Sequence, residues 1–210
     1  SQDFRKLVAN LVIVSVGTLV CLVAMQNTAA AAAVLYYTVH STLVTGALFL
    51  LADLIATQRG KAGDRLVSGR RVAQPVLLGS LFFMAAITVA GLPPLSGFIG
   101  KLMILQAAVT PLQQVLLWSV VLLSSLMVLI GLSRAGSTLF WRVSGTEPGG
   151  GKAPRLQIFA VIWLLLASPL LAVFAGPLTA LSQQAAAQLY DTATSNNIIL
   201  GQQPVQEIKP

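Results

Sequence analysis

The chain has 210 residues, of which 56% are hydrophobic and only 9% are charged, whereas a soluble domain carries about 25% charged residues. This composition excludes an ordinary soluble globular domain and indicates a polytopic membrane protein. The formal net charge of +7 could suggest nucleic acid. In a membrane protein, basic loops on the cytoplasmic side explain such a charge, so we expect no nucleic-acid partner.

Five apolar runs are long enough to cross a bilayer, which takes about 20 helical residues. They predict an all-α fold, a polytopic transmembrane helix bundle in which one helix is discontinuous. The expected spans cover residues 7–25, 29–55, 75–109, 111–133 and 156–174, and the fourth is expected to continue as a helix to Trp141. Residues 56–73 and 144–154 are predicted loops, and 178–190 a helix lying at the surface. The bundle would occupy residues 1–190 and a polar tail 191–210, as the C-terminal portion of a longer protein.

The basic residues segregate with these spans. If the N-terminal end is cytoplasmic, all of the 13 Lys and Arg residues except Lys101 and Lys209 lie on the cytoplasmic side. The positive-inside rule predicts this segregation, which supports both the number of spans and their orientation. The C-terminal tail would then lie on the opposite side of the membrane.

The third span is interrupted at residues 90–101, which read Ala-Gly-Leu-Pro-Pro-Leu-Ser-Gly-Phe-Ile-Gly-Lys. Proline cannot continue a helix, because it lacks an N–H donor and its ring clashes with the preceding turn. Glycine allows backbone angles that other residues avoid. The sequence therefore predicts a helix, a short unwound stretch and a second half-helix, with the break at Gly91, Pro93, Pro94, Gly97 and Gly100. Broken helices of this kind hold the binding site of many ion transporters.

Lys101 directly follows the break and is itself followed by Leu-Met-Ile-Leu rather than by a loop. An ionisable residue inside a membrane span is a candidate functional residue. Desolvation disfavours an ammonium, and so does the positive end of the half-helix that starts near Ser96, so we expect Lys101 to gain and lose a proton. The alternative is a lysine that extends to the membrane interface.

His40 is the single histidine of the chain and lies in the middle of the second span. It borders a polar stripe on one helical face, made by Tyr37, Thr38, Ser41, Thr42 and Thr45. Such a stripe facing the bundle interior can hold water, and imidazole titrates near physiological pH. The alternative is a packing histidine beside hydroxyls that bond neighbouring helices.

The remaining polar residues suggest structural roles. Asp53 is interpreted as an interfacial carboxylate, and Arg5 and Lys6 as anchors at the start of the first span. The sequence has no Ser/His/acid arrangement, no Cys or His cluster for a metal, and no phosphate-binding glycine loop. We therefore expect neither an enzymatic site nor a cofactor.

Three stretches resemble the proton-translocating antiporter-like family, and they follow one another along the chain in the same order as in that family. They are residues 91–105 around the break, 2–9 with Ile13 and Gly17, and 36–51 around His40. This family includes large subunits of multisubunit Na⁺/H⁺ (or K⁺/H⁺) antiporters and of respiratory NADH–quinone oxidoreductase. The Pro-Pro-Leu-Ser-Gly-Phe-Ile-Gly-Lys form of residues 93–101 looks most like the D-type antiporter subunits.

The resemblance implies a bacterial inner-membrane subunit that passes protons along lysines, histidines and water, and exchanges them for Na⁺ or K⁺. Lys101 matches the lysine of the family's discontinuous helix and His40 its central histidine. Tyr37, Ser41, Thr42, Thr45 and Ser96 would support them. The implied partners are the other membrane subunits of the complex and the lipid bilayer.

This sequence departs from the family pattern at a few positions. Asn10 stands where members often carry tyrosine, and Val44 and Thr45 where many carry lysine. Family members are more than twice as long, with a glutamate–lysine pair in their earlier part, so the chain alone is not expected to transport. Two other functions stay open: a proton-pumping subunit of a respiratory or hydrogenase-type complex, and a non-conducting membrane scaffold.

Overall fold

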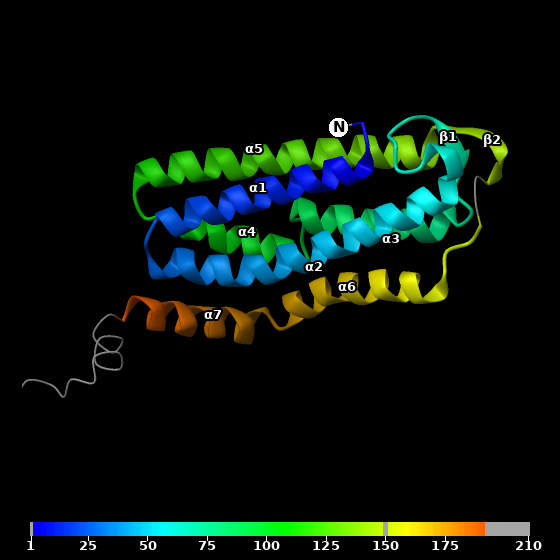
Figure 1. Ribbon diagram of the computed structural model, residues 1–210. Helices are drawn as coiled ribbons and strands as arrows, with labels where there is room; N and C mark the ends of the chain where they lie inside the picture. Colours follow the sequence, from blue (N-terminus) through cyan, green and yellow to red (C-terminus); the bar gives the residue numbers. More distant parts are fainter. Residues whose placement is uncertain (1, 149–150, 192–210) are drawn as a thin grey trace, which may run out of the picture.

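The computed structural model describes residues 2–148 and 151–191 of the chain (Figure 1). It is a bundle of long helices, which confirms the predicted all-α fold. The helices are α1 (Phe4–Ala24), α2 (Thr28–Arg59), α3 (Pro75–Ala90), α4 (Ser96–Gln106), α5 (Pro111–Gly136), α6 (Arg155–Val173) and α7 (Ala175–Tyr190). The predicted tail lies outside the described residues, apart from Asp191.

Four helices of the described part are long and apolar enough to cross a membrane. They cover Phe4–Ala24, Thr28–Ala62, Pro111–Trp141 and Arg155–Val173. Helix α3 has only 16 residues, about 24 Å, which is shorter than the 30 Å hydrocarbon core. Helix α4 follows it after the predicted break and adds 11 residues. Together α3 and α4 form the expected discontinuous helix.

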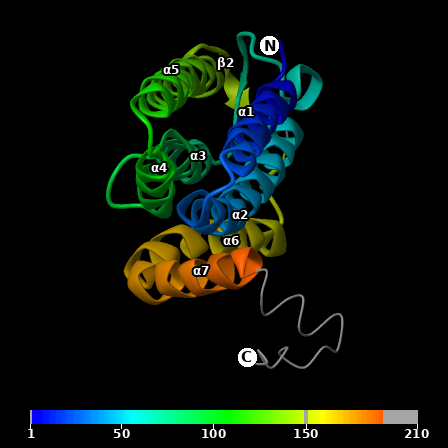
Figure 2. The ribbon, with the colours of Figure 1, turned by 90° about the vertical axis from the view of Figure 1, so that its left-hand side faces the viewer.

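Helix α2 is the centre of the bundle. It packs against α1, α3, α4, α6 and α7 (Figures 1 and 2). It begins after Asn27, whose side-chain oxygen accepts the N–H of Ala30 at 2.7 Å and caps the helix. Ala30, Ala32 and Ala33 are buried in its first turns, because small side chains let helices approach closely. The helix ends at Arg59, four residues later than the predicted span.

Helix α7 corrects one prediction. The sequence placed a surface helix at 178–190, but the structure begins this helix at Ala175, directly after α6, and packs it along α2. In Figure 1 it lies beside the N-terminal half of α2, in line with α6. Its alanine-rich sequence allows this contact, in which Ala186 is buried.

Both predicted loops contain a short strand that the sequence did not reveal. Strand β1 (Gly69–Arg71) pairs in parallel with β2 (Val143–Pro148), and Gly69 lies opposite Val143. Three residues with two arginines show no apolar alternation, so no strand pattern was visible. Helix α5 continues through a π-helical turn, Ser137–Trp141, to the residue predicted as its end. The strands therefore join two basic segments at one end of the bundle.

The apolar core is divided into two clusters along the bundle. One lies toward the strands and contains Phe4, Leu11, Leu51 and Val128 among others. The other lies toward the opposite end and includes Leu22, Ala33, Ile104 and Val121. Residues 12–18 of α1, 38–43 of α2 and 122–127 of α5 belong to neither cluster. The predicted site residues His40 and Lys101 lie at this intermediate level, near mid-height of the bundle.

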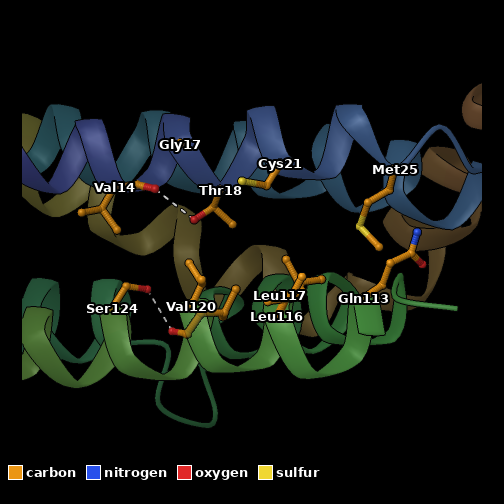
Figure 3. Close-up of a pocket in the computed structure, with 11 residues that line it drawn as sticks. Val14, Gly17, Thr18, Cys21, Met25, Gln113, Leu116, Leu117, Val120 and Ser124 are labelled. Carbon is orange, nitrogen blue, oxygen red and sulfur yellow. Dashed lines mark hydrogen bonds between the residues drawn. The ribbon is translucent and has the colours of Figure 1, made fainter. Parts of the chain in front are cut away.

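An apolar groove runs between α1 and α5 (Figure 3). Val14, Thr18, Cys21 and other residues of α1 face residues of α5, among them Leu117 and Ser124. The hydroxyls in the groove bond within their own helices, Thr18 to the carbonyl of Val14 at 2.9 Å and Ser124 to that of Val121 at 3.0 Å. The hydroxyl groups of Thr18 and Ser124 in the groove therefore already have hydrogen-bond acceptors.

Candidate functional site

The Lys101 ammonium lies in the break of the discontinuous helix. It donates to the carbonyl oxygen of Ala90 at 2.7 Å, to that of Val89 at 3.2 Å, and to Ser125 Oγ of α5 at 2.8 Å. A lysine ammonium has three N–H donors, so each has an acceptor. Val89 and Ala90 end α3, where carbonyls have no partner within the helix. Lys101 therefore satisfies backbone groups that the break exposes.

This contact corrects part of the electrostatic expectation. The sequence suggested only the positive end of α4 as a neighbour, but the ammonium lies against the last carbonyls of α3, which carry partial negative charge. The side chain is directed back toward α3 and α5. The ammonium of Lys101 in α4 thus donates hydrogen bonds to the unpaired carbonyls at the C-terminal end of α3.

Gly91 makes room for this arrangement. Its φ is +77°, and its N–H caps α3 by bonding the carbonyls of Ile87 and Thr88. A Cβ at this position would lie 2.6 Å from Lys101 Cδ. Glycine is therefore required here both for the left-handed backbone and for the close approach of the lysine.

A small cavity adjoins Lys101 between α1, α2, α4 and α5. Its volume is about 20 Å³, close to the space that one water molecule occupies. Its lining includes the hydroxyl residues Ser15, Tyr37, Ser124 and Ser125. Ser15 Oγ and Tyr37 Oη are 3.5 Å apart. The cavity thus places several groups that can exchange hydrogen bonds beside a primary amine.

His40 lies at the other side of the break. Its side chain is 3% exposed, and Nδ1 is 2.8 Å from the hydroxyl of Ser96, the first residue of α4. The opposite edge of the ring faces Gly97. A Cβ at Gly97 would lie 3.1 Å from His40 Nε2 and would collide with the carbonyl oxygen of Thr88. The histidine therefore fits between the end of α3 and the start of α4.

Lys101 and His40 both lie at the break of the discontinuous helix, but they form hydrogen bonds with different partners. Tyr37 lies between them: its side chain borders the Lys101 cavity, and its ring centroid is 5.6 Å from that of His40. Gly100 permits this position, since a Cβ there would lie 2.9 Å from Tyr37 Cδ2. Tyr37, which the sequence indicated as a supporting residue, is thus the side chain that contacts both halves of the site.

The polar stripe of α2 is otherwise placed differently from the prediction. Thr38 and Thr42 are exposed on the outer surface of the described chain, while Ser41 and Thr45 are partly buried. Thr38 and Ser41 bond carbonyls of their own helix. Within the part of the chain that the structure describes, Tyr37 is therefore the buried member of the stripe, and Ser41 and Thr45 are buried only in part.

Two serines that the sequence did not single out contact the site. Ser125 accepts from Lys101, and Ser168 of α6 lies 2.8 Å from Ser96 Oγ. Ser125 is part of a Ser-Ser pair in the apolar run of α5, and Ser168 precedes Pro169. These sequence features could have pointed to the two serines. Serine is common in transmembrane helices, however, so its position alone does not identify a site residue.

The predicted anchors lie at the basic end of the bundle, away from the break. Arg5 pairs with Asp53 at 2.7 Å, with both side chains about half exposed (48% and 49%). Arg59 is buried there and donates to the carbonyls of Gly63, Arg65 and Val67. The Arg59 contacts organise the loop between α2 and α3, whereas the pair of Arg5 and Asp53 joins α1 to α2. The described residues contain no group of His, Cys, Asp and Glu that could hold a metal ion.

The chain resembles known membrane subunits in sequence. It is 35% identical to the D-type subunit of a Na⁺/H⁺ antiporter of Bacillus subtilis, over 79% of this chain and 34% of that protein. It is 31% identical to a Rhizobium meliloti protein described as the probable D-type subunit of a K⁺/H⁺ antiporter, over 95% of this chain and 42% of that protein. The chain thus spans less than half of the length of these relatives.

Solved structures have the same fold. A chain of the Mrp complex from a Dietzia species matches with a TM-score of 0.80 and 22% identity, over 96% of this chain and 45% of that chain. A chain of respiratory complex I from Thermus thermophilus with bound NADH matches with a TM-score of 0.74 and 25% identity, over 89% and 40%. Residues 1–130 match the family described as NADH:quinone oxidoreductase/Mrp antiporter, transmembrane. With more than half of its length matched, this multi-pass membrane chain belongs to that family, as the resemblance around the break and His40 predicted.

Proposed function

We propose that the chain is part of a D-type membrane subunit of a multisubunit monovalent cation/proton antiporter, in which Lys101 and His40 relay protons with the help of water. Its relatives in Bacillus subtilis and Rhizobium meliloti are named for D-type antiporter subunits, which supports this assignment over an enzyme. The exchanged ion would be Na⁺ or K⁺, the two that those names give.

The observation that carries the proposal is the position of the Lys101 amine. It lies between the last carbonyls of α3 and Ser125, beside a cavity of about 20 Å³. A neutral amine there could take a proton from a water in the cavity, and the ammonium could return it. The Tyr37 side chain, at the same cavity and with its ring against His40, would connect the two titratable groups.

The surroundings of the subunit follow from charge and exposure. The basic segments between α2 and α3 and between α5 and α6 would face the cytoplasm of a bacterium, by the positive-inside rule. The exposed apolar side chains of α5, such as Leu122, Leu126 and Ile130, would contact lipid or the other membrane subunits. The C-terminal tail would then lie on the opposite side of the inner membrane.

A second function has a specific observation in its favour. The family name includes NADH:quinone oxidoreductase, and the fold matches a chain of respiratory complex I. The chain could therefore serve in a proton-pumping respiratory or hydrogenase-type complex. Quinone-linked redox activity in the purified complex would establish this alternative, and its absence together with cation/proton exchange would establish the antiporter.

Lys101→Ala tests the relay in the complete complex, assayed as cation-driven proton movement in inside-out membrane vesicles. We expect at least a tenfold lower rate at a normal amount of assembled complex, about 1.4 kcal/mol in the transport barrier. Lys61→Ala, which removes an exposed lysine of the basic loop, is the matched control and should keep the wild-type rate. Unchanged transport in Lys101→Ala would leave only a non-conducting scaffold.

A further inference from the structure

We infer that Ser168 of α6 is a positioning residue for His40, acting through the hydroxyl of Ser96. This inference rests on the proposed proton relay and extends it to the last predicted span. Three buried polar groups lie in a row: His40 Nδ1 is 2.8 Å from Ser96 Oγ, and Ser96 Oγ is 2.8 Å from Ser168 Oγ. Their exposed fractions are 3%, 0% and 1%.

The hydroxyl hydrogens of Ser96 and Ser168 can point in either direction along this row. A serine hydroxyl has one donor and two acceptor sites. When Ser168 donates to Ser96, the Ser96 hydrogen points at Nδ1, and the neutral His40 ring carries its proton on Nε2. When His40 takes a second proton at Nδ1, Ser96 turns to accept it and donates to Ser168. Ser168 therefore gives Ser96 a hydrogen-bond partner in both states of the ring.

A direct contact between α2 and α6 helps to position Ser168. Tyr36, one turn before His40 on α2, donates from its hydroxyl to the carbonyl of Leu171 at 3.1 Å. Leu171 is three residues after Ser168 and lies near the end of α6, where helix carbonyls lack a partner within the helix. The contact of Tyr36 with Leu171 lies one turn along from that of His40 with Ser96 and Ser168, and so fixes the register of α2 against α6.

The sequence of α6 weakens this helix next to Ser168. Pro169 lies inside the helix, directly after Ser168, and cannot donate to the carbonyl of Leu165. The helix is thus weakened by one hydrogen bond where it meets Ser96 and His40. A chain of hydrogen bonds across α2, α4 and α6 compensates for that loss and holds the imidazole in one orientation.

The test uses antiport in vesicles that contain the complete complex. Ser168→Ala leaves Ser96 without its second partner, and we expect about a tenfold lower initial rate, the effect of losing one buried hydrogen bond. Ser168→Cys keeps the volume but has only a weak S–H donor, so it should be similarly slow. Ser168→Thr keeps the hydroxyl and should retain at least half of the rate. Ser182→Ala, which removes a hydroxyl that bonds within α7, is the control and should match wild type.

The solvent isotope effect separates positioning from packing. If Ser168 supports proton movement at His40, the ratio of rates in H₂O and D₂O should rise in Ser168→Ala and stay at the wild-type value in Ser182→Ala. A wild-type rate in Ser168→Cys together with a slow Ser168→Thr would show that only volume matters and would overturn the inference. So would an unchanged isotope effect in a slow Ser168→Ala. Normal transport in Lys101→Ala and His40→Ala would instead refute the proposed relay itself.

Discussion

Lys101 donates from its ammonium to the carbonyl oxygen of Ala90, the last residue of α3, at a distance of 2.7 Å. One half of the discontinuous helix thereby satisfies the exposed end of the other. Unpaired backbone groups are costly at membrane depth, and irregular backbone is tolerated there only where protein or water satisfies it. The residue proposed to carry protons is therefore also part of what makes the break possible.

Lys101→Arg should impair transport although it preserves a positive charge. Arginine cannot be deprotonated in proteins, so it cannot take part in proton exchange. We expect at least a tenfold lower transport rate in vesicles, with near-normal complex assembly on native gels. Full activity of this variant would contradict the proton-relay role of Lys101.

Gly91→Ala should both destabilise the break and displace Lys101. A non-glycine residue in the left-handed region costs about 1–2 kcal/mol, and the added Cβ would lie 2.6 Å from Lys101 Cδ. We expect a lower melting temperature of the purified complex and reduced transport. Gly17→Ala is the control, because nothing lies within 4 Å of its added Cβ, and it should be neutral or slightly stabilising. Equal behaviour of the two variants would refute the close contact.

Gly97→Ala should disturb the histidine side of the break. Its Cβ would meet the Thr88 carbonyl oxygen and the His40 ring at once, and backbone cannot move aside as a flexible side chain can. We expect poor assembly or strongly reduced transport. Gly46→Ala provides the comparison on α2, because its nearest neighbour would be Leu164 Cδ1 at 3.7 Å, an ordinary contact. A Gly97→Ala complex that behaves like Gly46→Ala would argue against this packing.

Arg59→Ala should loosen the loop between α2 and α3. The buried guanidinium donates to three loop carbonyls, and charged hydrogen bonds are worth more than neutral ones, so we expect a loss of about 3 kcal/mol in the free energy of unfolding. Limited proteolysis should cut residues 60–73 faster. Asp53→Asn, which breaks the half-exposed pair with Arg5, should cost less than about 1 kcal/mol. A larger effect from Asp53→Asn than from Arg59→Ala would contradict this ranking.

The orientation can be measured by cysteine labelling. Cys21 is the single cysteine of the chain, so Cys21→Ser removes it and provides the background against which new labelling is compared. A membrane-impermeant maleimide should label Lys61→Cys in inside-out vesicles, because basic loops face the cytoplasm. It should label Val109→Cys, in the exposed connection between α4 and α5, only in right-side-out vesicles. The reverse labelling would invert the proposed topology.

The sequence by itself determined the membrane class, the helical fold and the place of the break. Hydropathy reveals spans because a bilayer demands about 20 apolar residues, and Gly-Leu-Pro-Pro cannot form a regular helix whatever surrounds it. These are local constraints that act within one segment. They also marked Lys101 and His40, since rare polar residues in apolar spans stand out.

Only the tertiary structure decided which groups these two residues meet. Ser125 and Ser168 are 24 and 72 residues from their partners in sequence, and nothing local distinguishes them from other serines. The stripe of α2 turned outward at Thr38 and Thr42, and α7 joined the bundle, because packing of neighbouring helices sets each helix's rotation. Such contacts depend on where separate helices lie against one another, and a sequence pattern in one helix does not record that.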